Sequence, residues 1–219
     1  ARSGTERPSV GMGVIEFWFE FASTYSYPAA MRIEALTSAA GHTVAWTPFL
    51  LGPLFHSQQG LTDSPFNAFP VKGRYMWRDF ARVCAKEDLP LETPAVFPQN
   101  GLLAARCTLA LPEEARAAFV KAVYTENFAR GAMISEPDVI ARCVESAGQD
   151  SGAVLARSGS DEIKAELKAN TGEAIRRGVF GSPTFFADDG EMFWGNDRLE
   201  DAIAWQDAPR KVKSIGGTK

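Results

Sequence analysis

Hydroxyl side chains are concentrated at one junction of the chain, directly after an apolar segment that begins at Val14. The junction reads Ala22-Ser23-Thr24-Tyr25-Ser26-Tyr27, and the residues after it have the apolar spacing of a helix. A strand that ends at a helix N-terminus presents unpaired backbone N–H groups and partial positive charge at a cleft. We therefore expect this junction to favour an anion, with Ser23 at its mouth.

Other catalytic and metal-binding patterns are missing. His42 and His56 have no further histidine, cysteine or carboxylate at ligand spacing, so we predict structural or exposed roles and no metal site. The Gly-x-Ser-x-Gly pattern of serine hydrolases does not occur at the junction. There is no Cys-x-x-Cys pair, and we expect the cysteines to be buried, unpaired thiols within helices; they are Cys84, Cys107 and Cys143.

The hydrophobic pattern predicts strands towards both ends of the chain and helices between them. We expect parallel strands at 14–21 and 43–50, joined by a helix that ends near residue 40 and starts late or kinks at Pro28. Residues 52–70, rich in Gly, Pro, Ser and Asn, are expected to form a long loop with a short helical turn. Helices are then expected at 72–87, 100–111, 112–130, 135–148 and 160–177. A β-hairpin at 184–194 and a helix at 198–205 complete the pattern.

This order of elements is that of an α/β thioredoxin-like fold with an inserted all-helical domain. We predict a thioredoxin-like domain from residues 14–51 and 179–208, and a helical insertion at 52–178. The remaining segments are a disordered N-terminal tail at 1–13 and a C-terminal tail at 209–219.

The predicted fold suggests functional roles for two positions, Pro183 and Ser23. Pro183 follows the small residue Ser182 and precedes a predicted strand, which is where the fold places a cis-proline. The residue before such a proline turns its backbone outward and can pair with a peptide-like ligand. The alternative is an ordinary trans proline that opens an edge strand. Ser23 stands where redox members of the fold have their attacking cysteine.

Composition narrows the class of partner. The chain has 219 residues, 45% of them apolar and 23% charged, which is ordinary for a soluble globular protein. A net charge of −4 argues against a nucleic-acid partner, because phosphate binding needs clustered Lys and Arg. No apolar run approaches the roughly 20 residues that cross a bilayer, so we expect no membrane partner. Without a disulfide pattern, a reducing compartment such as the cytoplasm is expected.

Four segments carry a more specific pattern. They run from Trp18 to Tyr27, from Pro70 to Asp79 (Pro-x-Lys-x-x-Tyr-x-x-x-Asp), from Val179 to Phe185, and from Trp194 to Leu199 (Trp-Gly-Asn-Asp-Arg-Leu). In this order they resemble the 2-hydroxychromene-2-carboxylate isomerases and the kappa-class glutathione transferases, in the DsbA-like branch of the thioredoxin superfamily. The last segment points to the isomerases. The chain has Glu20, Thr24 and Pro28 where the family commonly has Asp, Pro and a Leu-like residue, and these differences bear on substrate choice.

The resemblance implies glutathione as cofactor, since a chain with Ser in place of the attacking cysteine must borrow its thiol. Ser23 would be the catalytic residue, donating a hydrogen bond to the sulfur and favouring its ionised form. The remaining expected glutathione-binding residues are Ser182 and Pro183 for the cysteinyl part, Asn196 and Asp197 for the γ-glutamyl end, and Lys72 with Asn67 for a carboxylate. Plain helix capping by Ser23, Asn196 and Asp197, and a solvated Lys72, are the alternatives.

The implied reaction converts 2-hydroxychromene-2-carboxylate reversibly to trans-o-hydroxybenzylidenepyruvate, a step in naphthalene-type degradation. The thiol would add transiently to the conjugated double bond of the ring-opened substrate, allow rotation, and leave unconsumed. An aromatic slot for this small aromatic carboxylate would be lined by Tyr25, Tyr75, Trp18 and Phe55, although large aromatics more often belong to a core. The family also implies a homodimer.

Three other functions stay open at this point. A kappa-like transferase or peroxidase would use glutathione on other electrophiles. A binding module would hold glutathione or a peptide without chemistry. A DsbA-like thiol oxidoreductase relative without its own redox cysteines would work through some other thiol, which the missing Cys-x-x-Cys disfavours.

Overall fold

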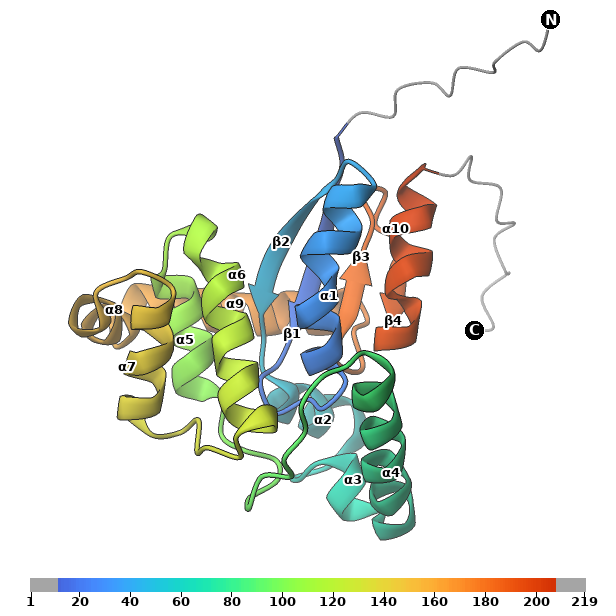
Figure 1. Cartoon of the computed structure of the whole chain (residues 1–219), viewed down its shortest axis with the longest axis horizontal. Coiled ribbons are helices and arrows are strands. Elements are labelled where there is room, and N and C mark those ends of the chain that lie inside the picture. The colour runs from blue at the N-terminus through green and yellow to red at the C-terminus, as the bar shows by residue number, and fades with distance from the viewer. Residues whose placement is uncertain (1–11, 208–219) are drawn as a thin grey trace, which may run out of the picture.

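A four-stranded mixed sheet organises the chain (Figure 1), and the computed structural model describes residues 12–207. The strand order is β2-β1-β3-β4, with β2 at Thr43–Pro48, β1 at Val14–Phe19, β3 at Thr184–Phe186 and β4 at Met192–Trp194. β1 and β2 are parallel and joined by α1 (Ser26–Ala39), and β3 is antiparallel to both β1 and β4. The predicted strand-helix-strand unit and the C-terminal hairpin are confirmed. Almost all of the two predicted tails lies outside the described residues.

Alternation along β1 gives the sheet two buried faces. Ile15, Phe17 and Phe19 are fully buried in the main core, where they pack with α1 and with α10 (Leu199–Asp207). Trp18 points to the opposite face and packs with Phe186 and with the C-terminal part of α9 (Asp161–Arg176). Helices therefore cover both faces of the sheet. A cavity opens beyond the C-terminal end of β1.

The helical segment between β2 and β3 agrees with most of the predicted helices. The confirmed helices are α4 (Pro70–Lys86), α5 (Leu102–Ala110), α6 (Glu113–Tyr124) with its π-helical continuation (Thr125–Ala129), α7 (Pro137–Ser146) and α9. A helix that the sequence analysis missed, α8, spans Ser151–Ser158, and Asp150 caps it by accepting a hydrogen bond from the N–H of Ala153.

The prediction of a long loop over residues 52–70 is wrong. The segment contains α2 (Leu51–Gln59) and the short α3 (Pro65–Ala68), and α4 begins at Pro70. Pro53 lies in the first turn of α2, where a missing N–H costs no intrahelical hydrogen bond. Gly60 ends that helix in the left-handed conformation, with φ at 64°. The Gly and Pro residues thus mark the ends of helices.

The inserted helices form two groups around the sheet. Helices α5 to α8 lie beside the β2 edge, whereas α2, α3 and α4 lie at the end of the sheet where β1 and β2 finish (Figure 1). Phe119, Tyr124 and Phe128 of the insertion belong to the same core cluster as Phe19 and Phe21. The insertion and the sheet therefore share one core, and the division into two domains stays a prediction.

Candidate active site

A cavity of about 770 Å³ opens between the end of β1 and helices α2 to α4. Its wall is mainly apolar, and large hydrophobic side chains that stay exposed at it are Phe69, Tyr75, Phe180 and Trp194. From the predicted site, the wall contains Ser23, Ser182, Lys72, Tyr25, Tyr75 and Phe55. The structure thus brings together residues from the beginning, middle and end of the sequence.

Ser23 and Ser182 are in direct contact on this wall. The hydroxyl of Ser23 donates a hydrogen bond of 2.8 Å to the carbonyl oxygen of Ser182. The peptide between Ser182 and Pro183 is cis, as predicted, and the carbonyl of Pro183 accepts the N–H of Gly195 at 2.9 Å. Within residues 12–207, the backbone N–H of Ser182 has no hydrogen-bond partner. The backbone N–H of Ser182 is therefore free to donate to a ligand, and the carbonyl of Ser182 accepts a hydrogen bond from the hydroxyl of Ser23.

The helix that follows the junction starts at Ser26, in agreement with the late start predicted from Pro28. α1 begins at Ser26, after a turn in which the N–H of Ser23 donates to the carbonyl of Glu20 at 3.1 Å. Ser26 is fully buried, and its hydroxyl lies 2.7 Å from the hydroxyl oxygen of Ser182. Pro28 falls in the first turn of α1, which accounts for the late start. Ser23 thus stands in the turn before the helix.

Glu20 is a buried carboxyl in the same wall, and the sequence predicted for it only a bearing on substrate choice, with no catalytic role. Only 8% of the residue is exposed, and its Oε2 accepts the N–H of Ala22 at 2.9 Å. Burial raises the pKa of Glu20 to about 7, and the Ala22 hydrogen bond opposes this shift. A glutamate inside an apolar run directly before the hydroxyl junction was the signal that could have found it.

Lys72 and Tyr25 give the wall two further polar groups. Lys72, near the start of α4, is the one basic residue among the described residues that line the cavity, and its Nζ lies 5.6 Å from the ring centroid of Phe66. Tyr25 donates a 2.7 Å hydrogen bond to Asp79. Burial, and then the hydrogen bond to Asp79, raise the pKa of Tyr25 above its usual range, so its phenol stays protonated.

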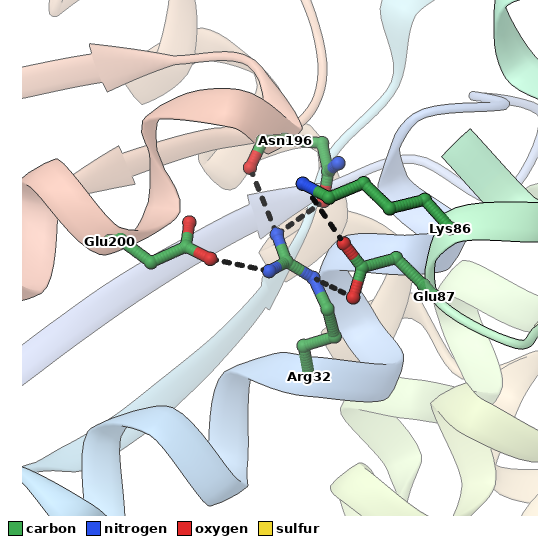
Figure 2. Close-up of polar contacts among 5 residues, drawn as sticks. All are labelled: Arg32, Lys86, Glu87, Asn196 and Glu200. Atoms are coloured by element: carbon green, nitrogen blue, oxygen red, sulfur yellow. Dashed lines mark hydrogen bonds and ion pairs between the residues drawn. The ribbon is translucent and has the colours of Figure 1, made fainter. Parts of the chain in front are cut away.

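Asn196 and Asp197 do not line this cavity. Asn196 is held from behind by Arg32 of α1, whose Nη2 donates to its carbonyl oxygen at 3.2 Å and to its Oδ1 at 3.0 Å (Figure 2). The same guanidinium pairs with Glu200 at 2.5 Å, and its Nε lies 3.8 Å from Glu87 (Figure 2). Asp197 is exposed beside it. Arg32 therefore fixes the turn that carries both residues, and their contact with glutathione stays a prediction.

Two predicted residues lie elsewhere. The expectation that Trp18 lines the aromatic slot is wrong, because strand alternation places it under α9, where its Nε1 donates to Glu16 at 2.6 Å. Asn67 is exposed on α3, and its amide donates to the carbonyl of Phe97 at 3.0 Å, so its predicted role is not supported by the cavity lining.

The cavity has no cysteine in its wall. Cys84, Cys107 and Cys143 are buried and unpaired, as predicted. Burial raises the pKa of their thiols to about 11, about 11 and about 12. Residues 12–207 contain no cluster of three or more His, Cys, Asp or Glu side chains suited to a metal, and no helix among them is long and apolar enough to cross a membrane.

Comparisons with known proteins agree with this geometry. Residues 14–203 match the DSBA-like thioredoxin domain family. The chain is 30% identical over 186 residues to a 2-hydroxychromene-2-carboxylate isomerase of Sphingobium xenophagum, covering 85% of this chain and 94% of that protein. It is 27% identical over 211 residues to glutathione S-transferase kappa 2 of Caenorhabditis elegans, covering 85% of this chain and 88% of that protein.

A solved structure shows the same architecture. The structure of a 2-hydroxychromene-2-carboxylate isomerase superposes with a TM-score of 0.78 at 28% identity and covers 88% of this chain and 95% of that one. Fold, motif order and sequence identity over most of both chains therefore agree. This chain belongs to the DsbA-like thioredoxin family, within the group that contains the 2-hydroxychromene-2-carboxylate isomerases and the kappa-class glutathione transferases.

Proposed function

We propose that this protein is a glutathione-dependent isomerase that interconverts 2-hydroxychromene-2-carboxylate and trans-o-hydroxybenzylidenepyruvate. The observation that carries the proposal is the Ser23–Ser182 contact on the cavity wall, with an unused N–H on Ser182. The relationship to proteins named as isomerases of this substrate supports the reaction.

The backbone of Ser182 fits a peptide-like cofactor. A peptide ligand in extended form offers a carbonyl to the free N–H of Ser182 and an N–H to its carbonyl, as in strand addition. A hydroxyl has only one hydrogen to donate, so Ser23 gives up the Ser182 carbonyl when it turns towards another acceptor. Binding of the cysteinyl part of glutathione would thus release the Ser23 hydroxyl for the sulfur.

The residues of this chain supply binding, orientation and charge stabilisation. Glutathione, when bound, supplies a nucleophilic thiol that adds reversibly to the conjugated double bond of the substrate. Ser23 donates to the sulfur, and a hydrogen bond to a charged group contributes about 1.5–3 kcal/mol. Lys72 binds a carboxylate of substrate or cofactor, and the apolar wall around Tyr25, Tyr75 and Phe55 excludes water from the ring.

The site offers no competing thiol chemistry of its own. All three cysteines are buried, and their raised pKa values keep them protonated at neutral pH. The proposal places the protein in the cytoplasm as a homodimer, in a compartment that glutathione keeps reducing. Asn196 and Asp197, beyond the Ser182 end of the cavity, are proposed to hold the γ-glutamyl group.

The test is an absorbance assay of chromene isomerisation with and without glutathione, together with calorimetric titration of glutathione. We expect binding, and turnover that requires glutathione at less than stoichiometric amounts. A product that retains the tripeptide by mass spectrometry would favour a kappa-like transferase. The absence of glutathione binding would contradict the proposal.

A further inference from the structure

We propose that Glu20 is the proton acceptor of this site: its Oε1 takes up the proton of the glutathione thiol and returns it when the thiol re-forms. The inference rests on the proposed use of glutathione and goes beyond it by assigning the destination of the thiol proton. It is carried by the position of Glu20 in the wall and by its unused carboxyl oxygen.

Hydrogen bonds hold Glu20 against both serines. Its N–H donates to the hydroxyl oxygen of Ser182 at 3.0 Å, and its carbonyl accepts the N–H of Ser23 at 3.1 Å. The hydroxyl of Tyr124 donates to the same carbonyl at 2.9 Å. The backbone of Glu20 is therefore part of the turn that presents Ser23, and the hydrogen bond from the N–H of Ala22 to Oε2 holds its side chain beside that turn.

Of the two carboxyl oxygens of Glu20, one accepts a hydrogen bond and the other has no partner. Oε2 accepts the N–H of Ala22 at 2.9 Å, whereas Oε1 has no hydrogen-bond partner within residues 12–207. Oε1 faces Gly101, where a Cβ atom would lie 3.0 Å from it and 2.9 Å from the Cβ of Phe21. Glycine at 101 thus leaves space around the oxygen. Oε1 itself is not fully buried, so a ligand in the cavity can reach it, and a carboxylate oxygen without a donor is free to accept a proton.

Within residues 12–207, no positively charged side chain lowers the pKa of Glu20. Burial raises its pKa to about 7, and the only opposing influence is the Ala22 N–H. The hydroxyls of Ser23, Ser26 and Ser182 are neutral, and the raised pKa values of Tyr25 and Tyr124 keep their phenols neutral. The charged groups in the wall besides Glu20 are Lys72 and Asp63, both exposed, and neither contributes to the pKa of Glu20.

Two negative charges on the same wall of the cavity would oppose each other. A like charge nearby raises the pKa of a carboxyl further, so ionisation of the thiol favours protonation of Glu20. In the proposed step the S–H bond breaks, an O–H bond forms at Oε1, and the electron pair stays on sulfur. The total charge of the site does not change. Ser23 stabilises the sulfur, and Glu20 stores the proton until the thiol is released.

The experiment measures proton exchange by titrating glutathione calorimetrically in buffers of different ionisation enthalpy. About pH 8 is suitable, because it lies above the pKa of Glu20 and below the roughly 8.5 of a free thiol. Titration of S-methylglutathione, which has no thiol proton, is subtracted. We expect the unmodified protein to release almost no proton, whereas Glu20→Gln releases about 0.5–0.7 proton per glutathione bound. Asp63→Asn, a matched change to the other acidic residue of the described wall, should behave like the unmodified protein.

Equal proton release by the unmodified protein and Glu20→Gln would overturn the inference and leave the proposed function standing. Absence of binding of either tripeptide would overturn both. A second measurement needs no variant: infrared difference spectra of the unmodified protein at the same pH. We expect a protonated carboxyl band on adding glutathione and none on adding S-methylglutathione. A spectrum without that band would contradict the inference even if Glu20→Gln does not fold.

Discussion

The hydroxyl of Ser23 has one hydrogen to donate, and we propose that its acceptor changes when glutathione binds. In the structure this hydrogen satisfies the carbonyl of Ser182, at 2.8 Å. A bound peptide N–H can replace it there, and the hydroxyl is then free to stabilise a charged sulfur. Glu20, just behind the same turn, has the opposite property, since its Oε1 is a free acceptor. Donor and acceptor thus occupy neighbouring positions of one wall.

The buried carboxyl of Glu20 makes stability depend on pH. Its pKa rises from 4.5 to about 7 on folding, so the native state binds the proton more tightly than the unfolded state. The contribution of this group to stability is therefore largest below about pH 4.5 and falls as pH rises towards 7, by up to about 3 kcal/mol. Denaturant unfolding at about pH 5 and about pH 8 should show Glu20→Gln losing less stability than the unmodified protein, by up to about 3 kcal/mol. Equal losses would show that Glu20 is not desolvated.

Sequence reasoning found Ser23, Ser182 and Lys72 because each lies in a short motif at a strand end or helix start. It did not assign Glu20 a catalytic role, because the burial that raises its pKa depends on packing between segments far apart in the sequence. Trp18 was misplaced for a different reason. It alternates with Phe17 and Phe19 along β1, but which face of the sheet adjoins the cavity depends on where α9 packs.

At the scale of elements, α2 and α3 form much of the cavity wall. They occupy the segment predicted as a loop, because Gly52, Pro53 and Pro65 were interpreted as helix breakers. Each lies in the first turn of its helix, where both residue types are tolerated. Composition alone does not distinguish a loop from short helices separated by breakers. The long helices α4, α6 and α9 were predicted because their apolar period persists over several turns.

Gly60 and Gly52 provide a matched test of α2. Gly60 ends the helix with φ at 64°, a conformation that costs other residues about 1 kcal/mol or more. Gly52 lies inside the first turn with nothing within 4 Å of its would-be Cβ. Chemical denaturation should show Gly60→Ala destabilised by about 1 kcal/mol, and Gly52→Ala unchanged or more stable by up to about 1 kcal/mol. The reverse order would mean that α2 is not the helix described.

At the scale of the whole molecule, one core joins the sheet to the inserted helices. Phe128, just after α6, is fully buried and stacks on Tyr124 with centroids 6.4 Å apart. Tyr124 in turn contacts Phe19 at the end of β1. The sequence predicted an insertion from the order of elements, but periodicity does not tell whether an insertion has its own core. That depends on long-range packing of these aromatic rings.

Phe128→Ala tests this shared core. Removing a buried phenylalanine costs about 3–5 kcal/mol. Because the core is continuous, we expect the sheet and the insertion to unfold together in a single transition at lower denaturant concentration. In a background in which the other four of the five tryptophans are replaced by phenylalanine, the fluorescence of Trp46 reports on β2, and far-ultraviolet circular dichroism reports mainly on the inserted helices. Loss of helical signal well before the fluorescence change would show two independent domains.

We propose above all that glutathione binds with its sulfur against the hydroxyl of Ser23. The most direct test is the thiol pKa of bound glutathione. It is measured from the ultraviolet absorbance of the thiolate as pH is varied. In the unmodified protein we expect this pKa to lie about 1–2 units below the roughly 8.5 of a free thiol. Ser23→Ala should raise it by a similar amount. Ser57→Ala, which removes a hydroxyl that bonds to the carbonyl of Leu54 at 3.0 Å, should leave it unchanged. Bound glutathione that titrates like the free thiol, or a pKa that Ser23→Ala does not shift, would contradict the account.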